Sequence, residues 1–144
     1  MIIRIKRLRE AAVPPTKGSP EAAGVDLRAC LEQPVEIRPD ETVKIPTGFA
    51  MELPSGYAGL IYARSGLATK EGLAPANKVG VIDPDYRGEI IVALHNHSLE
   101  TRTVIHGERI AQLVVTPFLT CEFEEGDLSE TERGAGGFGS TGKS

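Results

Sequence analysis

The sequence predicts a single-domain, all-β fold of the sandwich, jelly-roll or barrel kind. Ten prolines and sixteen glycines are spread along the 144 residues and divide the chain into short segments. In many of these segments apolar and polar residues alternate with a period of two, the pattern of strands with one buried face. The length is typical of one domain, and many short strands separated by turns favour a sandwich, jelly roll or barrel.

Strand candidates follow one another along the whole chain. Alternation is clear at Phe49, Met51 and Leu53, which precede a Pro-Ser-Gly turn. Trp is absent and aromatic residues make up only 5% of the chain, so the core must be aliphatic. One short helix is expected over 66–70, with Ser65 as its N-cap. The predicted strands are residues 2–8, 35–37, 43–45, 49–53, 57–62, 89–95, 102–106, 109–116 and 121–124.

The end of the chain differs from the rest. From Ser129 to Ser144 nearly all residues are small or polar, and Phe138 is the one aromatic residue. Such a segment cannot by itself bury enough apolar surface to stay ordered. It is therefore either a disordered tail or an arm that folds over something. We expect a β core over 1–128 and a mobile arm over 129–144.

Composition excludes several classes of function. The formal net charge of −4 argues against a general nucleic-acid binder, which needs a basic surplus. No segment approaches the roughly 20 apolar residues of a membrane helix, and the N-terminus lacks the apolar region of a signal peptide. Cys30 and Cys121 fit no CxxC pattern and are expected to be free thiols in a reducing compartment. The expected location is the cytoplasm.

Two phosphate-binding patterns in the tail are expected to be false matches. Gly134 to Gly139 fits GxGxxG, and Gly137 to Ser144 fits the Walker A pattern. Each pattern needs a strand before the loop and a helix after it, because the helix N-terminus holds the phosphate. Neither is predicted here, so neither a P-loop nor a Rossmann site is expected. The glycines would still let backbone N–H groups approach an anion.

Three histidines raise the question of a metal site. His95 and His97 have a metal-like spacing, and His106 is near in sequence. No thiolate or third well-placed ligand completes a zinc site. Alternation along a strand explains the pair, so no zinc is expected.

Five segments stand out from the rest of the chain: 23–27, 63–68, 80–88, 107–112 and 133–142. In this order and spacing they resemble the five motifs of the homotrimeric dUTPase family. The resemblance spans residues 22–142. It implies a distorted jelly-roll or β-barrel with one short helix and a flexible Gly-rich C-terminal arm. It also implies Mg2+-dependent hydrolysis of dUTP to dUMP and pyrophosphate.

The resemblance implies that Asp83 is the catalytic general base. Aspartate is ionised at neutral pH, and its carboxylate can deprotonate a water that attacks the α-phosphorus. Asp85, two residues further on, is expected to be part of the turn only.

The same resemblance implies a nucleoside pocket. The Asn77 amide offers both a donor and an acceptor to the uracil edge, together with the backbone of Gly80, Val81 and Ile82. Tyr86 would stack on the sugar and leave no room for a ribose 2′-OH.

The phosphate-binding residues implied by the resemblance lie in the second and fourth segments. They are Arg64, Ser65, Gly66 and Gln112. Asp26 in the first segment would touch the hydration shell of Mg2+, an ion that keeps several waters and often binds through substrate phosphates.

The tail would be a lid over the bound nucleotide. Phe138 would stack over the uracil, Arg133 would meet the γ-phosphate, and Gly139, Ser140 and Thr141 would add donors. In the family three chains share each site: segments one, two and four come from one subunit, the third from a second subunit and the tail from a third. A homotrimer is therefore expected, with no DNA, RNA or membrane partner.

Three alternative functions remain open. A dCTP deaminase resembles dUTPases in fold and assembly, but it uses a glutamate for deamination and lacks the Phe-Gly-Ser lid. A non-catalytic relative would bind a nucleotide or a protein partner without the catalytic residues, and Asp83, Arg64 and the tail are all present. A purely structural jelly roll would leave the five segments unexplained.

Overall fold

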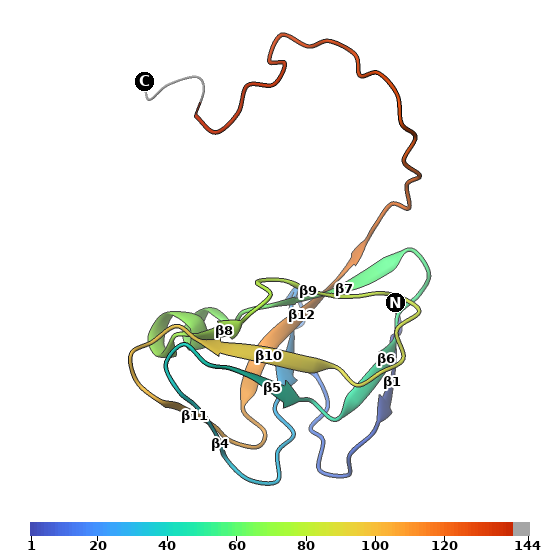
Figure 1. Ribbon diagram of the computed structural model, residues 1–144. Coiled ribbons are helices and arrows are strands. Elements are labelled where there is room, and N and C mark those ends of the chain that lie inside the picture. The colour runs from blue at the N-terminus through green and yellow to red at the C-terminus, as the bar shows by residue number, and fades with distance from the viewer. Residues whose placement is uncertain (140–144) are drawn as a thin grey trace.

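Antiparallel sheets form the body of the protein in a computed structural model, which describes residues 1–139 (Figure 1). Every strand pairing in this range is antiparallel, as expected for a chain of hairpins and longer returns. The architecture is the jelly roll of an all-β protein, which confirms the predicted fold class. The strands are β1 Arg4–Arg7, β2 Thr16–Lys17, β3 Val25–Arg28, β4 Val35–Ile37, β5 Thr42–Pro46, β6 Phe49–Glu52, β7 Tyr57–Tyr62, β8 Leu73–Pro75, β9 Gly80–Ile82, β10 Ile91–Asn96, β11 Arg102–Val104 and β12 Arg109–Pro117.

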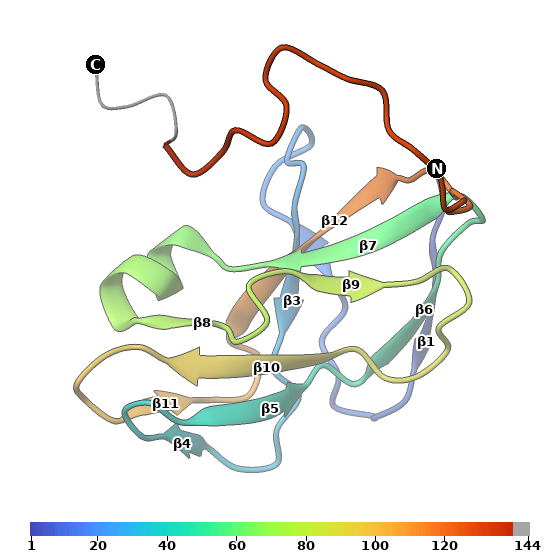
Figure 2. The same cartoon turned by 45° about the horizontal axis from the view of Figure 1, so that its top comes forward.

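The largest sheet has the strand order β2-β3-β12-β7-β9. A three-stranded sheet, β5-β10-β8, lies across from it, and the pairs β1-β6 and β11-β4 close the ends (Figure 2). The longest strand, β12, runs between β3 and β7 and makes the most extensive pairing of the fold. Segments that are far apart in sequence therefore meet across β12.

The core between the sheets is aliphatic, as predicted. Phe49 and Met51 are the only large buried hydrophobic side chains in residues 1–139 that are not aliphatic, and each is less than 5% exposed. Alternation explains the pattern on β10, where Val92, Leu94 and Asn96 point inward. Fully buried aliphatic side chains are Leu27, Ile37, Ile45, Leu73, Ile90, Val92, Leu94, Val104 and Ile110.

Two local expectations were wrong. Residues 121–124 form no strand: β12 ends at Pro117, and Phe123 is 96% exposed with no neighbouring strand to pair with in the described chain. The helical segment is a π-helix, η1, over Leu67–Glu71, and Ser65 and Gly66 directly before it are already helical, so Ser65 is not an N-cap. Its hydroxyl therefore caps no backbone N–H, and its carbonyl accepts a hydrogen bond from the Thr69 hydroxyl at 2.7 Å.

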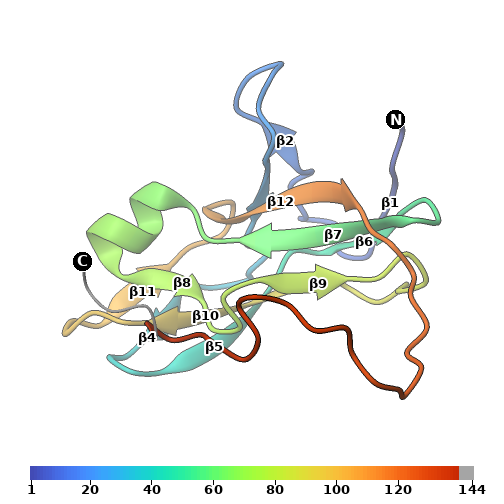
Figure 3. The ribbon, with the colours of Figure 1, turned by 90° about the horizontal axis from the view of Figure 1, so that it is seen from above.

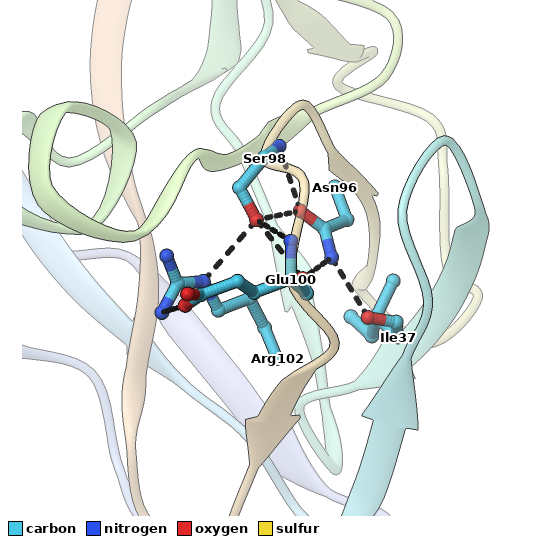
Figure 4. A network of polar contacts seen from close by, with 5 residues as sticks. All are labelled: Ile37, Asn96, Ser98, Glu100 and Arg102. Atoms are coloured by element: carbon cyan, nitrogen blue, oxygen red, sulfur yellow. Dashed lines mark hydrogen bonds and ion pairs between the residues drawn. The ribbon is translucent and has the colours of Figure 1, made fainter.

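Asn96 is a buried polar residue that joins the turn after β10 to β4 (Figure 4). Its amide nitrogen donates to the carbonyls of Ile37 and Glu100, each at 2.8 Å. Its amide oxygen accepts from the backbone N–H of Ser98 at 2.9 Å and from the Ser98 hydroxyl at 2.7 Å. The side chain is fully buried, its bond to Ile37 is buried and the other three are partly buried, and together they fix the turn between β10 and β11 against β4.

Replacing Asn96 by Asp should destabilise the fold strongly. The aspartate has nearly the same shape, but a carboxylate oxygen would face the carbonyls of Ile37 and Glu100 in place of the amide donor. We expect the free energy of unfolding to fall by about 2–4 kcal/mol, the cost of leaving buried polar groups unpaired. Urea denaturation at pH 7 measures this loss. Gln33→Glu makes the same chemical change on an exposed residue and should change the unfolding free energy by less than about 0.5 kcal/mol. Equal effects at both positions would contradict this account of the Asn96 network.

Candidate active site

Part of the candidate site lies on the five-stranded sheet where three strands run side by side. Gln112 on β12 is directly opposite Asp26 on β3 and directly opposite Tyr62 on β7. Directly opposite residues on antiparallel strands share a face of the sheet. The first, second and fourth sequence segments therefore converge at this point, since Arg64 follows Tyr62 by two residues.

Asp26 is held between two arginines. Arg64 Nε donates to Asp26 Oδ1 at 2.8 Å, and Arg109 Nη1 lies 3.4 Å from Asp26 Oδ2. The Asp26 and Arg64 side chains are only 15% and 25% exposed, so this pair is screened less than a surface ion pair. One carboxylate thus orients two cations at the same place. We call Asp26, Arg64, Arg109 and Gln112 the arginine cluster.

Arg109 is the functional candidate that the sequence reasoning missed. Arg109 and Gln112 are three residues apart, so on a regular strand their side chains would point to opposite faces of the sheet. The pairing of β12 with β3 shifts between Arg109 and Ala111, and such a bulge moves Arg109 to the side of Asp26 and Gln112. The only available signal was its place inside the fourth segment.

Gln112 ties the cluster to the chain around it. Its amide nitrogen donates to the Ala63 carbonyl at 2.9 Å. Its amide oxygen packs so closely on Gly24 that a Cβ there would lie 2.3 Å from it. Gly24 is therefore required by the close approach of the Gln112 side chain. The hydrogen bond from Gln112 to Ala63 fixes the position of the backbone just before Arg64.

Ser65 and Gly66 lie next to the cluster at the start of η1, and both are exposed. The Ser65 hydroxyl caps no N–H, as described above, and is open to solvent. These two residues and Arg64 form one continuous polar edge.

A separate cavity of about 240 Å3 lies between β9 and β10. It is lined by Asn77, Gly80, Val81, Ile82, Asp83, Tyr86 and Glu89, with aliphatic side chains behind them. The structure therefore brings together all the residues predicted for the nucleoside pocket, and Asp83 lies on its wall. Gly80 makes room for this: a Cβ there would lie 3.3 Å from the Asn77 amide nitrogen and 3.2 Å from Ile61 Cβ.

The Asn77 side of the cavity is a tight turn between β8 and β9. The Val79 N–H donates to the Asn77 carbonyl at 2.7 Å, and the Ala76 N–H donates to the Ala93 carbonyl at 2.8 Å. Lys78 has φ of 65°, an uncommon backbone conformation for a residue other than glycine. This turn presents the exposed Asn77 amide at the mouth of the cavity.

Asp83 and Tyr86 flank the turn that follows β9. Asp83 is exposed, and its carbonyl accepts from the Tyr86 N–H at 3.1 Å. The Tyr86 hydroxyl donates to the Glu89 carbonyl at 3.0 Å. Asp83 and Asp85 also line an outer hollow of about 900 Å3 beside Ser55. Asp83 is therefore the residue of this turn that faces both the inner cavity and the outer hollow.

Glu89 is fixed by an arginine from the start of the chain. Arg9 Nε and Nη2 donate to the two carboxylate oxygens of Glu89 at 2.8 and 3.0 Å. The Gly48 N–H also donates to Glu89 at 2.9 Å. The hydrogen bond from Arg9 is the main cause that lowers the pKa of Glu89 below the ordinary value of 4.5, and the Gly48 bond adds to it against the opposing effect of burial.

This pKa shift predicts how stability changes with pH. A carboxyl whose folded-state pKa is depressed stabilises the fold above its unfolded-state value, and the contribution is lost as pH falls through the folded-state pKa. The difference in unfolding free energy between the native protein and Glu89→Gln should therefore be constant above about pH 5 and shrink as pH falls below 4.5. Denaturant titrations from pH 7 to pH 3 measure it. A difference that does not change with pH would contradict the assignment.

The arm is far from both groups of residues. Figure 1 shows it leaving β12 and arching away from the sheets, and residues 118–135 are all exposed. The hydrogen bonds of residues 129–139 are internal to the arm, such as the one from Arg133 Nε to the Gly136 carbonyl at 2.9 Å. Phe138 is fully exposed, and so is Gly139. Ser140 and Thr141 lie outside the described residues.

The described chain therefore contains the predicted site as three separate parts. The arginine cluster, the nucleoside cavity and the arm are each formed, but no hydrogen bond or ion pair among residues 1–139 joins one to another. Figure 3 shows η1 and β8 at the far end of the sheet from the start of the arm. No group of three or more His, Cys, Asp or Glu side chains within residues 1–139 could hold a metal ion. In the same range, no helix is long and apolar enough to span a membrane.

Known proteins share the fold of this chain. Solved structures of similar fold include a variant dUTPase of Staphylococcus bacteriophage 80alpha with dUpNHpp, which has a TM-score of 0.89, is 29% identical and covers 99% of both chains. Another is a variant dUTPase of phage phi11 of S. aureus described with a structural Mg(II) ion, with a TM-score of 0.82, 25% identity and coverage of 91% of this chain and all of that one. The fold and its cavity thus define a jelly-roll protein of the kind found in nucleotide enzymes.

Comparison of sequences shows the family to which the chain belongs. A deoxyuridine 5′-triphosphate nucleotidohydrolase of Desulfitobacterium hafniense is 53% identical, with 99% of this chain and 97% of that protein covered. The protein of the same name from Hahella chejuensis is 47% identical over 95% and 91% of the two chains. The pattern of the dUTPase family matches residues 10–142. The chain belongs to the dUTPase family, which confirms the resemblance found in the five segments.

Proposed function

We propose that this protein hydrolyses dUTP to dUMP and pyrophosphate, with Asp83 activating the water that attacks the α-phosphorus. The observation that carries the proposal is the cavity of about 240 Å3 that Asn77, β9, Asp83 and Tyr86 line together. The names of the relatives, which describe hydrolysis of deoxyuridine 5′-triphosphate, support it. We also propose that the protein binds dUTP as its substrate. A phage dUTPase of similar fold is described with dUpNHpp.

Asn77 and the backbone of Gly80, Val81 and Ile82 would select the base. An amide presents both a donor and an acceptor, which matches the alternating carbonyl and N–H groups of uracil. Cytosine has the opposite pattern at one position and would leave a polar group unpaired, a mismatch that can cost a factor of about 10⁴–10⁵. Thymine would be refused by lack of space for its methyl group.

Asp83 is suited to act on water because of where it lies. It is exposed, at the end of β9, on the boundary between the inner cavity and the outer hollow. This carboxylate can orient a water that enters from the hollow while the nucleoside occupies the cavity. Asp85 lines only the outer hollow, which supports giving the chemistry to Asp83 alone.

The arginine cluster would bind the triphosphate. Arg64, Ser65 and Gly66 offer a cation, a hydroxyl and backbone N–H groups on one edge, and Gln112 adds a neutral amide donor. Arg109 joins them through Asp26, at 3.4 Å. Positioned donors of this kind stabilise charge that develops on phosphate oxygens during the transfer.

Mg2+ is part of the proposal, and the donor set fits a particular way of holding it. Asp26 is the single carboxylate of the arginine cluster, and both of its oxygens face arginines. This suits an ion that arrives with the triphosphate, keeps its waters and touches Asp26 through one of them. When bound, Mg2+ would neutralise phosphate charge; the orientation of the phosphates would fall to Arg64, Ser65 and Gln112.

A homotrimer with shared sites would bring the three parts together. The arginine cluster of one chain, the nucleoside cavity of a second and the arm of a third would complete each site. Phe138 would then cover the uracil, Arg133 would meet the γ-phosphate, and Gly139, Ser140 and Thr141 would add donors. The separation of these parts within residues 1–139 supports sharing, as does closed symmetry as the common form of oligomers. The arm over 129–144 would act as a mobile lid on the 1–128 core.

We place the enzyme in the cytoplasm. Both cysteines are free, with Cys30 buried and Cys121 exposed, and an exposed free thiol suits a reducing compartment.

A substrate panel tests the proposed function. Purified protein with Mg2+ is given dUTP, dCTP, dTTP or UTP, and pyrophosphate and ammonia are measured. Pyrophosphate from dUTP alone is the expected result, because it requires the uracil pocket and exclusion of the ribose 2′-OH together. Ammonia from dCTP would identify a deaminase. Binding of dUTP without any turnover would identify a non-catalytic relative.

A further inference from the structure

We infer that the ion pair between Arg9 and Glu89 positions Tyr86, and that it thereby sets how strictly the site discriminates deoxyribose from ribose. The inference rests on the proposed function, in which the Tyr86 ring faces the sugar. Arg9 lies outside all five segments that resemble the family motifs, so this is a role for a residue remote from the site in sequence.

The Tyr86 ring is held by polar contacts rather than by burial. The residue is 45% exposed. Its hydroxyl donates to the Glu89 carbonyl at 3.0 Å. The ring lies over Gly88 so closely that a Cβ at Gly88 would be 2.4 Å from the hydroxyl oxygen. The position of the ring therefore depends on where the backbone of residues 88 and 89 is held.

Glu89 is where that backbone becomes fixed. Its carboxylate receives the two parallel hydrogen bonds from Arg9, an arrangement that restricts geometry more than a single contact does. A third bond comes from the Gly48 N–H at 2.9 Å. The Glu89 side chain is only 16% exposed, whereas that of Arg9 is 49% exposed. The carboxylate is thus the inner, immobile end of the pair, and Arg9 closes it from the solvent side.

The restraint reaches the site because the other contacts of the turn before Glu89 are local or exposed. The Tyr86 N–H donates to the Asp83 carbonyl at 3.1 Å, Arg87 Nη1 donates to the Pro84 carbonyl at 2.6 Å, and the ion pair of Arg87 with Glu52 at 3.6 Å is exposed. Beyond Glu89 the chain is pinned to β6 and the residues before it, since the Ile90 N–H donates to the Phe49 carbonyl at 2.8 Å and the Thr47 hydroxyl donates to the Ile90 carbonyl at 2.7 Å. Before it, residues 85–87 are exposed. The Glu89 carbonyl is therefore the first firmly held atom after Asp83 that the Tyr86 hydroxyl can reach.

Loosening this anchor should affect ribose exclusion before it affects turnover. Refusing one hydroxyl group requires the ring to stay within a fraction of an ångström, whereas dUTP already fits the pocket and does not press on the ring. Arg9 lies outside the nucleoside cavity, whereas Glu89 is part of its lining. No hydrogen bond or ion pair of the described residues joins either of them to the groups proposed to act on water or phosphate. They are positioning residues, and their loss should appear as increased use of UTP.

The experiment compares kcat/KM for dUTP and UTP in the full-length protein with Mg2+. Arg9→Gln and Glu89→Gln should each lower the dUTP-to-UTP ratio about tenfold, the effect of losing one hydrogen bond to a charged group, mainly by raising UTP turnover. The kcat of Arg9→Gln for dUTP should stay within about threefold of the native value. Arg9→Lys keeps the charge without the two parallel bonds and should recover part of the ratio. Arg102→Gln, which removes another arginine that pairs with a glutamate at 3.5 Å, is the matched control and should leave the ratio unchanged.

Tyr86→Leu separates the failure of this inference from the failure of the proposed function. If Tyr86→Leu leaves discrimination intact, the sugar-facing role of Tyr86 is wrong and the inference falls with it. If Tyr86→Leu abolishes discrimination but folded Arg9→Gln, Arg9→Lys and Glu89→Gln keep the native ratio, the proposed function stands and the inference is overturned. A lower melting temperature in these variants with an unchanged ratio also overturns it, because the pair would then stabilise the fold only.

Discussion

Asp83→Asn should reduce kcat for dUTP by about 10²–10⁴-fold, the usual contribution of general-base catalysis, while the Kd for dUTP changes little. The asparagine has the same shape and can still line the cavity beside Tyr86. It cannot accept a proton from water at neutral pH. A loss in kcat without a loss in binding marks an interaction made only in the transition state. Pyrophosphate release gives kcat, and equilibrium binding of dUTP to the variant gives Kd.

Asp85→Asn is the matched control for this variant. It makes the same change two residues away in the same turn, but Asp85 lines only the outer hollow. Its kcat should stay within about threefold of the native value. A native rate in Asp83→Asn, or an equal loss in both variants, would remove Asp83 from the role of general base.

Truncation after Asp127 should lower turnover by at least about 10²-fold and leave the fold intact. A closing lid excludes water and holds the substrate in its reactive geometry, and small losses of positioning can cost this much. The fold should survive because residues 118–135 are exposed and make no strand pairing within residues 1–139. Pyrophosphate release and the melting temperature measure the two effects separately.

A shorter truncation provides the comparison. Removing only residues 142–144 spares every arm residue assigned to the substrate and should preserve turnover. Full activity after removal of the whole arm would refute the lid, whereas loss of folding would mean that the arm is a structural element of the assembly.

How far the sequence could predict the structure depended on how local each signal was. The alternation at 35–37 and 43–45 predicted β4 and most of β5, because each strand has one buried and one exposed face. The alternation of Cys121 and Phe123 with glutamates also matched the pattern of a strand. A strand needs a partner strand as well, and the sequence of one segment does not show whether a partner lies beside it. β2, β8 and β9 are two or three residues long, too short for any period to show.

The site divides in the same way. Residues of the nucleoside cavity lie within ten positions of one another, from Asn77 to Tyr86, and a local pattern captured them. Arg109 was missed because a bulge reverses the face on which it lies. The Arg9–Glu89 pair was missed because it joins positions 80 apart, and no local pattern links them. Ser65 was misassigned as a cap because the helix starts one residue earlier than its sequence suggests.

Hydrolysis of dUTP in water enriched in oxygen-18 tests the central claim most directly. Mass spectrometry of the products, formed with Mg2+ present, should find one labelled oxygen in dUMP and none in pyrophosphate, because the water is proposed to attack the α-phosphorus beside Asp83. Label in pyrophosphate would mean attack at the β-phosphorus and would contradict the assigned geometry. Absence of both products would contradict the proposed activity itself.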